Sequence, residues 1–143
     1  MSKITRFSDF RAFQASREFV RETGLLLRTP AFRPNNILSA QIERASISVL
    51  SNFAEGFERD GNVEFIQFLA ISKGSVGELR AQLIYGLDLG IIEQTTFDRL
   101  DVLGESSTRL LGGLMRYLAQ PGKQGRKFAQ RKRARQPTRN SEP

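Results

Sequence analysis

The chain contains no cysteine, no histidine and no tryptophan. The lack of cysteine excludes disulfides, thiol catalysis and thiolate metal sites. The lack of histidine removes the commonest general base and metal ligand. It also argues against a di-iron site, because four-helix bundles that hold one use two Glu-x-x-His motifs. We therefore expect no metal site and no cofactor.

Long hydrophobic runs are also missing from the sequence. A membrane-spanning helix needs about 18 consecutive apolar residues, and no segment approaches that length. Charges are scattered through the first 13 residues, which lack the apolar core of a signal peptide. These absences predict a cytoplasmic protein with no membrane contact.

The charge of the chain is divided unevenly. Residues 1–119 hold 14 basic and 14 acidic residues, whereas residues 120–143 hold eight basic residues and one acidic residue. The whole net charge of +7 therefore lies in the last part of the chain. That part has one phenylalanine and no periodic apolar positions, so we predict a basic, disordered tail over 120–143. Residues 1–119 have the length of one domain.

Residues 1–119 follow the helical period in four segments, with no sustained alternating pattern typical of strands. The connections between them are short, which favours antiparallel neighbours. The fold class predicted is all-α, an antiparallel up-and-down four-helix bundle. The four helices are expected from Ser8 to about Arg28, from Ile37 to about Phe57, from Val63 to about Leu89 and from Thr95 to near Ala119.

Helix-capping residues are expected at the start of each helix. Ser8 is predicted as the first N-cap, Asn35 or Asn36 as the second and Asn62 as the third. Thr95 with Asp98 nearly matches a capping box at the fourth helix.

The stretch 41–59 places a row of polar side chains between two apolar flanks when it is wound into a helix. Because a buried unpaired polar group costs about 1–3 kcal/mol, such a row needs internal partners. We expect Arg44 to form a bidentate salt bridge with Glu78 of the third helix. This polar cluster either fixes the register of the helices or holds a ligand. Its members are Gln41, Arg44, Ser48, Asn52, Glu55, Ser75 and Glu78.

The third helix has apolar residues on more than one face and two internal glycines, Gly74 and Gly77. Each glycine costs about 1 kcal/mol relative to alanine inside a helix, which is explained if a neighbouring backbone comes close there; the alternative is sequence drift. Helices with two apolar faces expose more apolar surface than one thin bundle can bury. We therefore expect a homo-oligomer.

Two motifs on these helices carry a resemblance to a known family. QIERASISVLSNFAEGFER at 41–59 and EFIQFLAISKGSVGELRAQL at 64–83 resemble the signatures of the 23S rRNA intervening-sequence proteins, a four-helix-bundle family. Relatives of that family include the accessory variability determinants of diversity-generating retroelements. The resemblance covers about residues 10–118. The chain departs from the family pattern at Phe53, Ser72 and Phe13, where isoleucine, alanine and tryptophan are usual.

The resemblance implies a homopentameric barrel of bundles. For the retroelement branch it also implies binding of RNA and of a reverse transcriptase through a basic surface. The motif residues shared with the family are Gln41, Arg44, Ser48, Asn52, Glu55, Gly56, Gly74, Ser75 and Glu78.

The basic tail is the strongest functional feature outside these motifs. Its cations can each approach a phosphate, so we expect the tail to bind nucleic acid. The alternative is a solubilising extension that binds polyanions without selectivity. The predicted nucleic-acid-binding residues are Lys123, Arg126, Lys127, Arg131, Lys132, Arg133, Arg135 and Arg139.

These features together predict a non-enzymatic, oligomeric protein that binds RNA, with no catalytic residues. Most acidic residues occupy surface or helix-end positions, and the tail segment GKQGRK lacks the spacing of a phosphate-binding loop. An assembly adaptor that binds a protein partner such as a reverse transcriptase is the alternative function. An enzyme would need a ligand-lined cavity near Arg44, Asn52 and Glu78.

Overall fold

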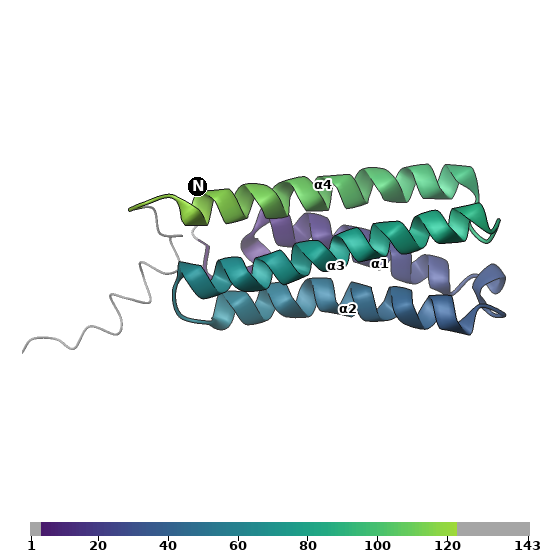
Figure 1. The fold of residues 1–143 in the computed structure, drawn as a ribbon, viewed down its shortest axis with the longest axis horizontal. Helices are drawn as coiled ribbons and strands as arrows, with labels where there is room; N and C mark the ends of the chain where they lie inside the picture. Colours follow the sequence, from purple (N-terminus) through teal and green to yellow (C-terminus); the bar gives the residue numbers. More distant parts are fainter. Residues whose placement is uncertain (1–3, 123–143) are drawn as a thin grey trace, which may run out of the picture.

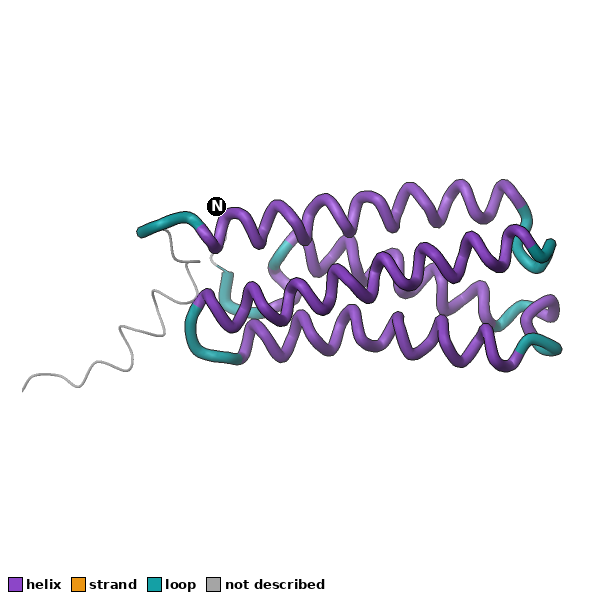
Figure 2. Tube along the Cα trace, in the orientation of Figure 1, coloured by secondary structure: helices purple, strands orange, loops and turns teal. Residues whose placement is uncertain are grey.

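The protein, represented by a computed structural model described over residues 4–122, is an all-α four-helix bundle (Figures 1 and 2). The long helices run along one axis, and the connections lie at the two ends of the bundle (Figure 2). This confirms the predicted all-α bundle, while residues 123–143 of the predicted tail lie outside the described residues. The elements are η1 (Phe7–Asp9), α1 (Arg11–Leu27), η2 (Pro30–Phe32), α2 (Asn36–Glu58), α3 (Asn62–Asp88) and α4 (Gln94–Ala119).

Each helix packs against the helices before and after it, and α4 returns to pack against α1. The helices therefore form a closed square in which α1 lies diagonally opposite α3. In Figure 1, α1 is the distant helix and lies behind α3, with α2 and α4 on either side. The outer face of α3 and the outer face of α1 consequently point in opposite directions.

The helix boundaries agree with the sequence to within a few residues, but of the predicted N-caps only Asn35 stands at its position. Ser8 lies in η1, and α1 begins after Phe10. Asn62 is the first residue of α3, where its side-chain nitrogen donates to the carbonyl of Leu118 on α4 (3.3 Å). Its amide spans two helices instead of capping its own.

At the second and fourth helices, too, the predicted capping residues form hydrogen bonds other than the expected capping bonds. Asn35 does stand at the N-cap of α2, but its side chain donates to the carbonyl of Ala31 (3.1 Å). The N-cap of α4 is Glu93, and Asp98 accepts from Gln94 (2.8 Å) instead of completing a capping box with Thr95. Sequence patterns therefore predict the positions of the helices correctly, but not the hydrogen-bond partners of the polar residues at their N-termini.

Phenylalanine dominates the core at the end of the bundle where α2 meets α3. Phe53 and Phe65 are fully buried and meet edge to face, with ring centroids 5.7 Å apart. Aromatic rings prefer this geometry because the positive edge of one meets the negative face of the other. Phe7 joins from the N-terminal segment, and the remaining rings in mutual contact are Phe10, Phe13 and Phe57.

Two glycines allow neighbouring helices to approach closely. A Cβ at Gly56 of α2 would lie 2.5 Å from the Cβ of Phe68 on α3. A Cβ at Gly104 of α4 would lie 2.9 Å from both Arg80 and Phe19. These positions accept no larger side chain without a shift of the helices.

Buried hydroxyls also join the helices. Ser16 of α1 and Ser107 of α4 are both inaccessible to solvent, and their Oγ atoms lie 2.7 Å apart. Ser72 of α3 donates to the backbone carbonyl of Val49 on α2 (2.6 Å). Within residues 4–122, no helix is long and apolar enough to cross a membrane.

Candidate nucleic-acid interface

The described bundle is nearly neutral, but its charges are segregated. Residues 4–34, which include α1, hold six arginines and three acidic residues. Residues 35–92, which include α2 and α3, hold four basic and seven acidic residues. The part of the bundle that includes α1 therefore has a net positive charge and the part that includes α2 and α3 a net negative charge, so the α1 side is the one that attracts a polyanion.

The outer face of α1 carries a line of exposed arginines. Arg17, Arg21 and Arg28 are exposed, and their spacing places them within about 40° of one another around the helix. Arg17 and Arg21 are about 6 Å apart along the axis, and Arg28 is about 10 Å further on. The sequence reasoning missed this line, although the spacing of the arginines is visible in the sequence.

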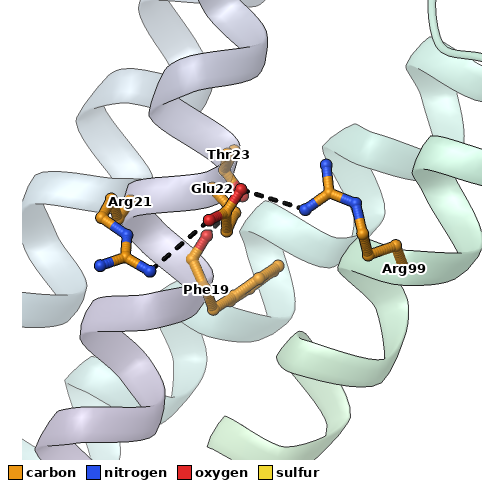
Figure 3. Close-up of polar contacts among 5 residues, drawn as sticks. All are labelled: Phe19, Arg21, Glu22, Thr23 and Arg99. Carbon is orange, nitrogen blue, oxygen red and sulfur yellow. Dashed lines mark hydrogen bonds and ion pairs between the residues drawn. The ribbon is translucent and has the colours of Figure 1, made fainter.

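Some of this positive charge is compensated. Glu22 lies between two guanidinium groups, 3.5 Å from Arg21 and 3.0 Å from Arg99 of α4 (Figure 3). Thr23, beside it, is buried and donates to the carbonyl of Phe19 (2.8 Å; Figure 3). On the other side of α4, Asp101 pairs with Arg80 of α3 (3.3 Å). Exposed ion pairs of this kind contribute little stability, but Glu22–Arg99 joins α1 to α4 and Arg80–Asp101 joins α3 to α4.

The predicted polar cluster is only partly assembled within the chain. Ser48 and Ser75 join α2 to α3 through Oγ atoms 2.7 Å apart. Asn52 donates to both the carbonyl and the hydroxyl of Ser48, each at 2.9 Å. These three side chains form a half-buried network that joins the two helices.

The expected bridge between Arg44 and Glu78 is wrong for the single chain. No ion pair joins them among the described residues. Both side chains are exposed, and Glu78 accepts instead from Gln82 of its own helix (3.3 Å). Gln41 is likewise exposed.

Glu55 also faces solvent and has a local partner. Its carboxylate accepts from Arg59, one turn further along the chain, at 2.9 Å. This hydrogen bond and the charge of Glu55 raise the pKa of Arg59 above its ordinary value. The guanidinium of Arg59 also lies over the ring of Phe68, 5.2 Å from its centroid.

Gln41, Arg44 and Glu55 of the polar row face solvent, and the second apolar flank beside the row is only partly covered within the chain. Ile47, on that flank, is 59 % exposed, whereas Ile42 and Val49, on the first flank, are fully buried. Periodicity places both flanks correctly, but the second is less well covered: Leu50 packs half-buried against the core, while Ile47 stays exposed.

The eight predicted nucleic-acid-binding residues of the tail, from Lys123 to Arg139, lie outside the described residues. Among residues 4–122, no three histidine, cysteine, aspartate or glutamate side chains gather into a group that could hold a metal ion. Two hollows on the described bundle, of about 630 and 620 Å³, are open surface grooves. Arg44 lines a third, smaller open hollow of about 310 Å³ together with Ala40, Glu43 and Ile47.

Comparison with known proteins identifies the family. No curated protein matches the chain closely. The sequence pattern of the family described as 23S rRNA-intervening sequence protein matches residues 8–113. This match begins just before α1 and reaches into the second half of α4, so it spans most of the bundle. The chain belongs to the family of 23S rRNA-intervening sequence proteins.

Proposed function

We propose that the protein is a non-enzymatic, self-associating RNA-binding protein of the cytoplasm, and that its basic residues make the contacts. The observation that carries the proposal is the concentration of eight cations and one acidic residue in 120–143, beside a bundle with 13 basic and 14 acidic residues over 4–122. The family description, which refers to rRNA, favours RNA over DNA as the polyanion.

The contacts are electrostatic in this proposal. Each arginine or lysine that neutralises a phosphate releases a condensed counterion, so affinity falls as salt rises. The tail supplies most of the contacts, and the exposed arginines of α1 extend the positive surface onto the bundle. The polar cluster on α2 and α3 has a structural role.

The test is RNA binding by the full chain and by a chain ending at Gln120. Fluorescence anisotropy with a labelled single-stranded RNA is measured over a salt series. If most of the eight cations of the tail contact phosphates, the affinity of the full chain falls by about a thousandfold between about 50 and 200 mM salt. The shortened chain binds far more weakly. RNA binding that is unchanged in the shortened chain, or insensitive to salt, contradicts the proposal.

An assembly adaptor is the second candidate function, favoured by the large apolar side chains that are exposed on the bundle, such as Ile47 and Ile84. In that function a bundle face binds a protein, for example a reverse transcriptase of a diversity-generating retroelement, and the tail only assists. Deletion of the tail then leaves partner binding intact, and that binding depends little on salt. A reverse-transcriptase gene beside this gene would favour the adaptor.

A further inference from the structure

Two cations from different helices converge on one point of the bundle surface. Lys73 belongs to α3 and Arg116 to α4, and these helices pack side by side (Figure 1). A Cβ at Gly112 of α4 would lie 3.3 Å from Nη1 of Arg116 and 3.9 Å from Nζ of Lys73. Both distances start from the same point, so the two nitrogens are at most about 7 Å apart. Lys73 and Arg116 are named here the α3–α4 cation pair.

The α3–α4 cation pair has no acidic partner. Among residues 4–122, no ion pair joins Lys73 or Arg116 to a carboxylate. Arg80, further along α3, is different, because Asp101 of α4 compensates it at 3.3 Å. Two positive charges held this close repel each other. The pair therefore favours an anion from outside the described chain.

The acidic residues of α3 lie on other sides of that helix. Measured around the helix from Lys73, Glu64 is about 180° away and Glu78 about 140° away. The excess of acidic residues over 35–92 is therefore not concentrated beside Lys73.

The surface of α4 next to the pair is also positive. Arg109 is exposed, lies about 20° from Arg116 around the helix and is about 10 Å from it along the axis. Glu105, one turn before Arg109, is about 10 Å from Gly112 along the axis. A small anion at the pair therefore meets cations before it meets a carboxylate.

Two adjacent glycines leave the backbone of α4 open beneath the pair. The Cβ position of Gly113 is 3.8 Å from Nη2 of Arg116, and no other atom is recorded within 4 Å of it. Although Arg116 is in the last turn of α4, its guanidinium extends back over Gly112 and Gly113, away from the carbonyls at the helix end. An anion can thus reach both cations without displacing a side chain at these two positions.

We propose that the α3–α4 cation pair holds one phosphate of the RNA backbone. The inference rests on the RNA binding in the proposed function and adds a fixed contact on the bundle. Phosphate oxygens accept charge-assisted hydrogen bonds of about 2.8 Å from such nitrogens, so one phosphate spans the pair. Because α4 ends at Ala119, directly before the basic segment 120–143, the pair and that segment can bind neighbouring parts of one strand.

The test measures RNA binding by full-length variants over a salt series. The variants are Lys73→Gln, Arg116→Gln and the double variant. The matched control combines Arg33→Gln and Arg44→Gln, which remove the same charge from exposed positions nearer the other end of the bundle. Fluorescence anisotropy with a labelled single-stranded RNA reports affinity, while light scattering and circular dichroism check mass and fold.

The double variant is expected to bind about tenfold more weakly than the wild type, because a charge-assisted contact is lost. The slope of log affinity against log salt becomes shallower by about 0.7, the value for one phosphate of a single strand. Each single variant shows most of this loss, since both side chains hold the same phosphate. The control loses little, because charges more than about 10 Å away are screened at about 0.1 M salt.

Gly113→Glu reaches the same site by another route and keeps both cations. Its carboxylate, one turn before Arg116, can pair with that guanidinium and take the place of the phosphate. RNA binding is expected to weaken by about tenfold. Gly113→Gln, which is equal in size but uncharged, is expected to bind as the wild type does.

A loss of affinity in the double variant no larger than that of the control overturns the inference, while salt-dependent binding by the wild type still supports the proposed function. A slope change of about 1.4 also overturns it, because each cation would then hold its own phosphate. If the full chain binds no RNA, the proposed function itself fails.

Free phosphate is the other source of the same anion. Thermal unfolding in inorganic phosphate and in chloride, at equal ionic strength, distinguishes it from RNA. Phosphate is expected to stabilise the wild type and the double variant equally. Stabilisation of the wild type alone, with equal RNA affinity of the two proteins, would assign the pair to a free anion and overturn the inference.

Discussion

At the scale of single residues, the glycines of the bundle divide by what surrounds them. Gly104 lies against the fully buried ring of Phe19 and the aliphatic part of the Arg80 side chain. Gly113, on the same helix, has only the end of one flexible side chain near its Cβ position, at 3.8 Å. The same methyl group therefore has opposite effects at the two sites.

Gly104→Ala is expected to lower the free energy of unfolding by about 1–2 kcal/mol. Overpacking a core costs about 1–3 kcal/mol, and the higher helix propensity of alanine offsets part of that cost. Gly113→Ala, as the control, gains up to about 1 kcal/mol. Denaturant unfolding followed by circular dichroism measures both changes. A Gly104→Ala protein as stable as the wild type would show that α1, α3 and α4 are packed less tightly than described.

Asp9 links the stability of the N-terminal segment to pH. Its carboxylate accepts from the backbone nitrogens of Thr5 and Arg6, both at 3.0 Å, and these bonds lower the pKa of Asp9. Because the folded pKa lies below the unfolded value, the stabilisation is present above about pH 4 and is lost as the pH falls further.

Asp9→Asn is therefore expected to remove part of the pH dependence of unfolding on the acidic side. The two proteins differ in stability at neutral pH and converge as the pH drops below about 4. Thermal unfolding of both, measured across that range, tests this expectation. A constant difference at every pH would assign the effect of the substitution to something other than the charge.

At the scale of secondary structure, sequence periodicity predicted the four helices well. α2 and α4 each begin and end within about a residue of the expected positions. The caps at Ser8, Asn62 and Thr95 were wrong because a cap depends on which acceptor or donor lies nearest in three dimensions. Asn62 illustrates this, since its partner on α4 is 56 residues away in the sequence.

The polar row of α2 shows a second limit of periodicity. It identified Ser48, Asn52 and Ser75 as members of one network, and their hydrogen bonds confirm that they meet. It could not show that Arg44 and Glu78 face solvent, because a pattern of two apolar flanks is the same whether the second flank is covered by the same chain or by another.

The element most affected by this ambiguity is α3. Gly77→Ala is expected to raise the free energy of unfolding of the single bundle by up to about 1 kcal/mol, because nothing within the chain opposes the added methyl group. If a second copy packs there, the same methyl group weakens self-association. Mass as a function of protein concentration and thermal unfolding at low concentration separate the two effects. Unchanged association would place the interface elsewhere on the bundle.

At the scale of the whole molecule, the proposed function makes self-association and RNA binding reinforce each other. Each copy would bring eight tail cations, and copies held in one assembly would engage one RNA together. Binding of the second tail is then intramolecular, so avidity exceeds the affinity of one tail by about a hundredfold or more. A nearly neutral bundle limits the repulsion between copies that their tails create.

The Ile47→Arg protein tests this coupling, because it keeps the tail but places a charge on the partly covered flank of α2 and is therefore expected to be monomeric. It should bind a long RNA about a hundredfold more weakly than the wild type, while a short RNA that reaches only one tail is bound equally. The added arginine by itself increases attraction to RNA, so a loss of affinity cannot come from charge. Anisotropy titrations with the two RNAs give the comparison, with Val102→Arg, at an exposed position on α4, as the control of equal charge. Equal affinity of both proteins for the long RNA would mean that each tail acts alone and that assembly serves another purpose.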